Sequence, residues 1–112
     1  MKLEGERKLL RIFIGEQDRW KGAPLYEAIL NEARELKMAG ATVVKGFQGF
    51  GCKAHMHTAK LLELSMDLPL IIEIVDSEER LGRLLPRLDE MVGEGLITVE
   101  NVHVYLYRCA PG

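Results

Sequence analysis

Residues Leu68–Val75 (LPLIIEIV) form the most strongly patterned stretch of the chain, and they decide its fold. The run is short, apolar and rich in β-branched side chains, which is typical of a buried strand. Asp76 or Ser77 follows as a natural N-cap, and apolar residues then recur at helical spacing from Leu81 onward. The stretch therefore predicts a buried strand that leads directly into an amphipathic helix.

The rest of the chain supplies three further strands and one further helix. Residues Lys8–Ile14 alternate as a strand does, and the segment from Pro24 to Gly40 carries apolar residues at helical spacing, with Gly40 as its end. Thr42–Phe50 and Leu96–Tyr107 are the other two predicted strands. The order β-α-β-β-α-β predicts an α+β, ferredoxin-like fold in which two helices cover one face of an antiparallel sheet.

The composition indicates the class of protein. The 112 residues are 47% hydrophobic and 29% charged, as in an ordinary globular protein, so we expect a single domain over residues 1–112. A formal net charge of −2 argues against a nucleic-acid-binding surface. The sequence has no apolar run long enough to span a bilayer and no signal-peptide pattern. We therefore expect a cytoplasmic protein without direct membrane insertion, in which Cys52 and Cys109 are reduced thiols.

The second face of the predicted sheet is too apolar for a monomer. Its expected members are Leu9, Phe13, Ile71, Val75, Tyr105 and Tyr107, with Arg11, Glu73 and His103 among them. An uncovered face of an antiparallel sheet is normally polar, and a large apolar patch marks an interaction site. We therefore expect a homo-oligomer in which Arg11 pairs with Glu73. The alternative is an ordinary solvent-facing sheet with a surface salt bridge.

A long polar segment between the second and third predicted strands carries the candidate binding site. It opens with Gly46, Gly49 and Gly51, whose amides can approach a phosphate or ribose because no Cβ blocks them. The alternative is a bulge or tight turn that needs glycine only for its shape. The neighbouring Phe47 and Phe50 can stack on an adenine ring or pack in the core.

Charged residues near predicted strand ends are further candidates. Lys45 and Arg108 are the expected charge partners of a phosphate, and a solvated charge at a strand end is the alternative. Asp67, just before the third strand, either binds a ribose hydroxyl or caps the backbone of the loop.

Two histidines within the segment allow more than one function. His55 and His57 are two residues apart, so on an extended backbone their rings point the same way. With Cys52 they form the pattern C-x-x-H-x-H, which can bind zinc or copper, although a closed structural site needs a fourth ligand. There are two alternatives. Either one histidine contacts a phosphate, or both histidines are simply solvated in the loop.

No arrangement of residues in the sequence indicates catalysis. No serine or cysteine lies beside a histidine at a spacing that specifies a nucleophile and its base, and no pair of carboxylates stands out from the helix-surface acids. We therefore expect a protein that is not an enzyme and that needs no obligatory cofactor.

The chain resembles a small prokaryotic family grouped with the PII-like signalling proteins and long catalogued as a domain of unknown function. The residues that carry the resemblance are K-G-F-Q-G-F-G at 45–51, H-M-H at 55–57 and L-S-M-D-L-P at 64–69, and it extends over about residues 8–108. It implies a homotrimer whose sheets face a central axis, with an adenine nucleotide in the cleft between subunits. It also implies that residues 47–67 correspond to the T-loop, which in PII proteins reports ligand state to a partner, here a transporter or a metabolic enzyme.

Two departures from the PII pattern refine this expectation. No tyrosine lies within residues 47–67, so nucleotidylylation is not expected. The loop before the last strand shrinks to Gly93–Gly95, and its Glu94 would repel phosphate, which favours AMP or ADP over ATP. The predicted nucleotide-binding residues are Lys45, Gly46, Phe47, Gly49, Phe50, Gly51, His57, Asp67 and Arg108. The alternative function is that of a divalent-metal-binding trimer, with Cys52, His55 and His57 as ligands.

Overall fold

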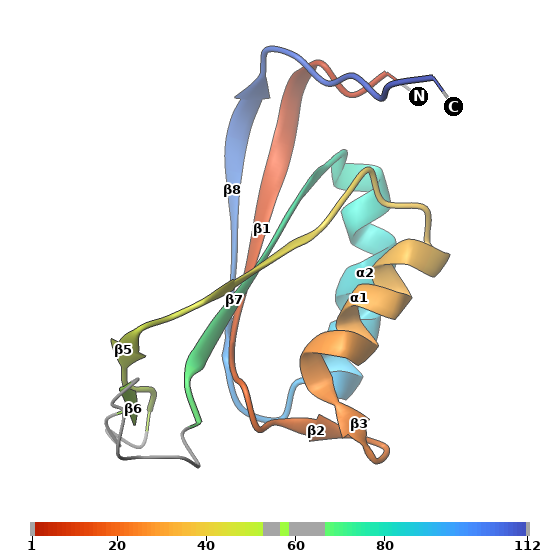
Figure 1. The fold of residues 1–112 in the computed structure, drawn as a ribbon. Coiled ribbons are helices and arrows are strands. Elements are labelled where there is room, and N and C mark those ends of the chain that lie inside the picture. Colours follow the sequence, from red (N-terminus) through yellow and green to blue (C-terminus); the bar gives the residue numbers. More distant parts are fainter. Residues whose placement is uncertain (1, 53–56, 59–66, 112) are drawn as a thin grey trace.

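Four antiparallel strands form the main sheet, and two helices cover one of its faces (Figure 1). The computed structural model describes residues 2–52, 57–58 and 67–111. The strands lie in the order β4-β7-β1-β8, and the helices α1 and α2 follow β3 and β7. The bounds are β1 Gly5–Gly15, α1 Leu25–Glu35, β4 Thr42–Lys45, β7 Pro69–Asp76, α2 Glu78–Met91 and β8 Leu96–Val104. This arrangement confirms the predicted ferredoxin-like fold.

Two short strand pairs lie outside the main sheet. The hairpin of β2 (Arg19–Trp20) and β3 (Ala23–Pro24) turns through Lys21 and Gly22, which have φ of 48° and 83°. Positive φ at both central residues is the geometry that lets a two-residue loop join twisted strands. The second pair consists of β5 (Gln48–Gly49) and β6 (His57–Thr58).

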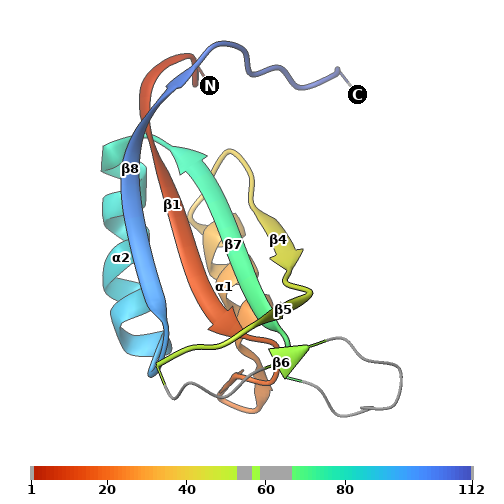
Figure 2. The same cartoon turned by 90° about the vertical axis from the view of Figure 1, so that its left-hand side faces the viewer.

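This second pair corrects the prediction for Thr42–Phe50. The strand in the main sheet ends at Lys45, and the chain then leaves the sheet to form β5. Both views place β5 and β6 on the side of the sheet opposite the helices, at one end of it (Figures 1 and 2).

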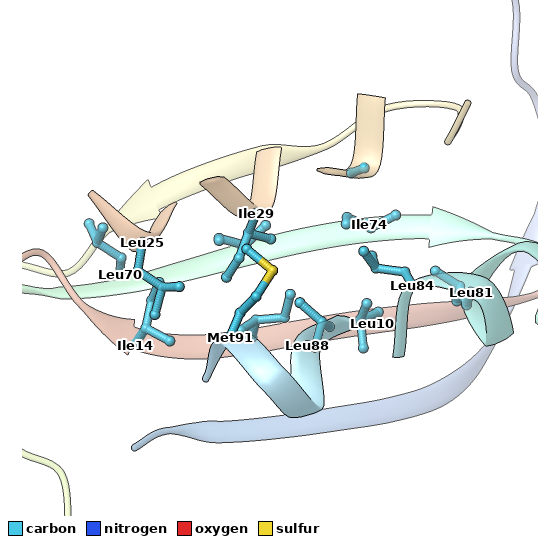
Figure 3. Close-up of a cluster of buried hydrophobic side chains, with 13 residues drawn as sticks. Leu10, Ile14, Leu25, Ile29, Leu70, Ile74, Leu81, Leu84, Leu88 and Met91 are labelled. Carbon is cyan, nitrogen blue, oxygen red and sulfur yellow. The ribbon is translucent and has the colours of Figure 1, made fainter. Parts of the chain in front are cut away.

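The core lies between the sheet and the two helices (Figure 3). Alternate residues of β1 and β7 point toward the helices, and the helical stripes predicted from the sequence meet them. The buried residues are Leu10, Ile12, Ile14, Leu25, Ile29, Ala33, Leu70, Ile72, Ile74, Leu81, Leu84, Leu88 and Met91. A side chain of this kind contributes about 1.5–3 kcal/mol when fully buried, so this layer supplies most of the driving force for folding.

The helix ends differ from the prediction at α1. Pro24 is the N-cap and not the first helical residue, and the Leu25 amide donates to the Asp18 carbonyl at 2.8 Å. The helix ends at Glu35, five residues before Gly40. Lys37, two residues after the end of the helix, adopts a φ of 64°. A left-handed residue after the last turn closes the helix even when it is not glycine.

The start of α2 matches the prediction. Ser77 is the N-cap, and its hydroxyl accepts a hydrogen bond from the Arg80 amide at 3.2 Å. The preceding Asp76 is 1% exposed, and its carboxylate accepts from the amides of Ser77 at 2.7 Å and Ala39 at 2.8 Å. This buried carboxylate therefore joins the start of α2 to the segment that follows α1.

The face of the sheet away from the helices carries a mixture of apolar and charged side chains, as predicted. Arg11 pairs with Glu73 at 2.8 Å, and its other arm pairs with Glu100 at 2.7 Å. These hydrogen-bonded carboxylates raise the pKa of Arg11. The apolar part of this face consists of Leu9, Phe13, Val44, Ile71, Val75 and Leu96; we call it the open face.

The last strand corrects the predicted composition of the open face. In the register of β1 with β8, His103 lies opposite Glu6, which alternates onto the helix side of the sheet. Tyr105 and Tyr107 follow the end of β8. The Tyr107 amide donates to Glu4 at 2.9 Å, which lowers the pKa of that carboxyl, and the Tyr107 hydroxyl donates to the Ala39 carbonyl at 2.9 Å.

Candidate functional site

The predicted site lies at the end of the sheet where β4 and β1 finish and β7 begins. The register places Lys45 beside Leu70, and Gly15 beside Pro69. The Gly46 amide donates to the Pro69 carbonyl at 2.6 Å. The two ends of the polar segment are therefore held together directly at the sheet, and we call this region the loop base (residues 45–51 and 67–69).

Two of the three glycines of the loop base are explained by packing against Pro69. A Cβ on Gly46 would lie 2.6 Å from the Pro69 Cγ, and one on Gly49 would lie 3.3 Å from it. Among the described residues, a Cβ on Gly51 would meet no atom within 4 Å. Because the Gly46 amide is already bonded to Pro69, the structure supports a shape role for that glycine. Gly51 has no such packing requirement.

A turn between β1 and β2 (residues 15–18) is hydrogen-bonded to the loop base. Asp67 Oδ1 accepts a hydrogen bond from the Gln17 amide at 2.7 Å, and the Leu68 carbonyl accepts from the Glu16 amide at 2.8 Å. Asp67 also lies so close that a Cβ on Gly15 would be 2.9 Å from its Oδ1. Of the two predicted roles of Asp67, the geometry shows the backbone-capping one.

An ion pair links the same turn to the other end of the loop. Lys45 Nζ lies 2.6 Å from Glu16 Oε2, with the Lys45 side chain 54% exposed and that of Glu16 26% exposed. Lys45 thus lies beside the glycines, as expected, but its ammonium group is already paired with the Glu16 carboxylate.

The two phenylalanines of the loop base are exposed. Phe47 is 70% exposed and Phe50 is 65% exposed, so neither packs in the core of its own chain. They flank β5, which lies on the open side of the sheet (Figure 2). Exposed aromatic side chains at this place are available to a ligand or to a second copy of the chain.

Arg108 does not join the other predicted residues within one chain. It follows β8 at the end of the sheet where β1 begins, near Glu4, whereas the loop base lies where β1 ends (Figure 1). His57 pairs with Gly49 through the backbone of β5 and β6. This pairing places the backbone of His57 beside Gly49 of the loop base.

Of the three candidate metal ligands, Cys52 and the backbone of His57 belong to the described residues and His55 does not. Cys52 is exposed and not in a disulfide, while His55 falls in the part of the chain that the structure does not describe. Over residues 2–52, 57–58 and 67–111, no group of three or more His, Cys, Asp or Glu side chains is arranged to hold a metal ion.

Two shallow hollows of the chain lie away from the loop base. One, of about 330 Å³, is lined by Glu6, Arg7, Lys8, Glu78 and Asn101. The other, of about 260 Å³, is lined by Leu30, Ala33, Arg34, Met38, Gly40 and Ala41. Neither includes a predicted site residue.

Sequence reasoning did not identify Glu16 as part of this region, nor the contact of Pro69 with the glycines. Glu16 follows the first predicted strand directly, and a ferredoxin-like topology places the end of that strand beside the start of the third. That neighbourhood was a usable signal for Glu16. The contact of Pro69 with two glycines depends on the exit path of β4, which the sequence does not specify.

Comparison with known proteins identifies the family. The model of the DUF190 family, described as "Uncharacterized ACR", matches residues 7–104. The chain belongs to this family. It is 40% identical over 101 residues to a UPF0166 protein of Aquifex aeolicus, covering 88% of this chain and 93% of that protein.

Solved structures with the same fold are PII-like proteins. CPII from Thiomonas intermedia K12, bound to ADP and bicarbonate, matches with a TM-score of 0.68 at 22% identity, over 92% of this chain and 91% of that one. A GlnK–ATP complex from B. subtilis matches with a TM-score of 0.55 at 19% identity, over 90% and 85% of the two chains. These likenesses show that the DUF190 chain has the PII-like fold. Among the described residues, no helix is both long and apolar enough to cross a membrane.

Proposed function

We propose that this DUF190 protein is a PII-like signalling protein that binds an adenine nucleotide at the loop base, between two copies of the chain. The observation that carries the proposal is the loop base itself, where Lys45, glycines and exposed aromatics gather at the end of the open face. The shared fold with CPII, whose structure holds ADP, and with GlnK, whose structure holds ATP, supports it.

Each residue of the loop base has a defined role in this proposal. Lys45 supplies positive charge to a phosphate, and the backbone near Gly49 and Gly51 allows close approach of the ligand. Phe47 and Phe50 offer faces for the adenine ring. Asp67 fixes the loop base through Gln17, and Gly46 does so through Pro69. His57, opposite Gly49 in β6, provides a further phosphate contact.

A homotrimer completes the site. The open face retains exposed apolar side chains, with Val44 44% exposed and Leu96 56% exposed, and burial of such a patch drives association. Arg108 lies at the far end of its own sheet, so it contributes to a loop base only as a residue of a neighbouring subunit.

The charge around the loop base favours AMP or ADP over ATP. Glu16 and Asp67 lie at the site, and Gly95 is packed so closely that a Cβ would be 2.7 Å from the Phe13 carbonyl. The short loop that contains Glu94 is therefore held near the end of β1 and adds no cation. Occupancy of the site would change the conformational populations of residues 47–67 and so the binding of a protein partner, a transporter or a metabolic enzyme.

Calorimetric titration of the purified protein with AMP, ADP and ATP tests this function, after its mass in solution has been measured. We expect a trimer that binds AMP and ADP with micromolar affinity and ATP more weakly. Substitution Lys45→Gln should weaken binding, whereas Lys8→Gln, a loss of the same charge at the opposite end of the sheet beside Asp76, should not. Absence of binding to all three nucleotides at millimolar concentration would refute the proposal.

A further inference from the structure

We infer that Glu16 is a built-in competitor of the ligand's phosphate for Lys45, and that it sets the preference of the site for less highly charged nucleotides. This inference rests on the proposed function. The structure shows the competing state, in which the Glu16 carboxylate lies 2.6 Å from Lys45 Nζ. A phosphate that binds Lys45 must share or displace that carboxylate.

The position of Glu16 makes it an effective competitor. Its backbone is fixed by the hydrogen bond from its amide to the Leu68 carbonyl, and its side chain is about three-quarters buried. Lys45 is the last residue of β4, and the next residue is bonded to Pro69. Both partners of the ion pair therefore start from fixed backbone, so that pairing orders only the two side chains.

The neighbouring carboxylates do not have this role. Asp67 accepts a hydrogen bond from the Gln17 amide, and Asp18 accepts one from the Gly15 amide at 2.9 Å. Each of these two carboxylates holds the backbone of the turn. Glu16 instead pairs with a side-chain cation of the loop base, Lys45. A change at Glu16 thus alters the charge of the site with both backbone caps intact.

Removal of this carboxylate should strengthen binding by two additive effects. It frees Lys45 from an ion pair of the partly exposed kind, which is worth roughly a two- to fivefold change in an equilibrium constant. It also removes repulsion between Glu16 and the phosphates, which grows with the charge of the ligand. We expect a gain of roughly three- to tenfold for ADP, less for AMP and more for ATP.

The experiment compares Glu16→Gln with the unmodified protein by calorimetric titration with AMP, ADP, ATP and inorganic tripolyphosphate. Glu79→Gln is the matched control, because it makes the same change in net charge at an exposed ion pair with Arg83 on α2, 2.8 Å long. Lys45→Gln and the double variant Glu16→Gln/Lys45→Gln complete a cycle that isolates the interaction between the two residues. Thermal melting of every variant checks that the fold is retained.

The expected result is tighter binding in Glu16→Gln, graded as ATP over ADP over AMP, no change in Glu79→Gln, and a smaller gain when Lys45 is also replaced. Unchanged or weaker binding in Glu16→Gln would overturn the inference, and so would an equal gain for all four ligands. If the unmodified protein binds AMP or ADP while Glu16→Gln behaves like Glu79→Gln, the proposed function stands and only the competitor role fails. If neither protein binds any nucleotide, both fall.

Discussion

The glycines of the loop base give a graded prediction about stability. An alanine at position 46 would place its Cβ 2.6 Å from the Pro69 Cγ and 3.1 Å from the Pro69 carbonyl oxygen. Carbon atoms in contact are normally about 3.5–4.0 Å apart, so either the loop base or β7 must move by about 1 Å. Pro69 is held by its pairing with Gly15 and by the Gly46 amide. Overpacking of this kind typically costs about 1–3 kcal/mol.

Gly51→Ala is the matched control for Gly46→Ala. A Cβ at Gly51 meets no atom of the described part of the chain within 4 Å. Neither glycine has a positive φ, so alanine strains the backbone at neither position. Both substitutions restrict the unfolded chain equally, an effect of about 0.4–1 kcal/mol in favour of the folded state. This effect cancels in the comparison. We therefore expect Gly46→Ala to be less stable than Gly51→Ala by about 1–3 kcal/mol, with Gly49→Ala between them.

Urea unfolding at one fixed protein concentration measures this series. The fixed concentration matters because association contributes to apparent stability. We expect the midpoint to fall in the order Gly51→Ala, Gly49→Ala, Gly46→Ala with little change in the slope, since the surface exposed on unfolding is the same. Equal midpoints for Gly46→Ala and Gly51→Ala would refute the account of Gly46 as a packing residue.

Two other features give direct predictions. Leu84 is fully buried between α2 and the sheet, and Leu84→Ala would leave a cavity there. This substitution should lower the free energy of unfolding, measured with urea, by about 2–5 kcal/mol. A loss below about 0.5 kcal/mol, as at a surface position, would contradict the packing in Figure 3. The Tyr107 amide lowers the pKa of Glu4 in the folded chain, so this contact stabilises above the ordinary pKa of the carboxyl and is lost as pH falls through the lowered one. The amide NMR signal of Tyr107 should shift with that acid transition and should not do so in Glu4→Gln.

The sequence was sufficient for the fold because its patterns are strong where the core is built. Leu68–Val75 and the leucines of α2 carry both the period and the burial that the structure shows. Element ends were less predictable. The second strand was expected to reach Phe50 but ends at Lys45, because Gly46 bonds to Pro69 and turns the chain out of the sheet. The helix α1 ends through Lys37, a residue type that gives no signal for a left-handed conformation.

The candidate site was predictable in part. Lys45, the glycines and Asp67 do converge at one end of the sheet, since the topology brings the ends of β4 and the start of β7 together. Arg108 does not lie with them, because β8 is antiparallel to β1 and ends at the opposite end of the sheet, where β1 begins. Glu16 was missed because an ion pair between residues so far apart in sequence depends on the register of the sheet.

The way in which one turn holds both ends of the segment 46–67 has a consequence for how this chain can vary. Glu16 contacts Lys45 at the entry and Leu68 at the exit, and Gly46 is bonded directly to Pro69. With the ends fixed, each doubling in the length of the connecting segment costs only about 0.6 kcal/mol. This is a small part of the roughly 5–15 kcal/mol by which domains are usually stable. Segments of quite different length and composition can therefore be exchanged above the same support, so that the surface shown to a partner can diverge while the sheet beneath it stays the same.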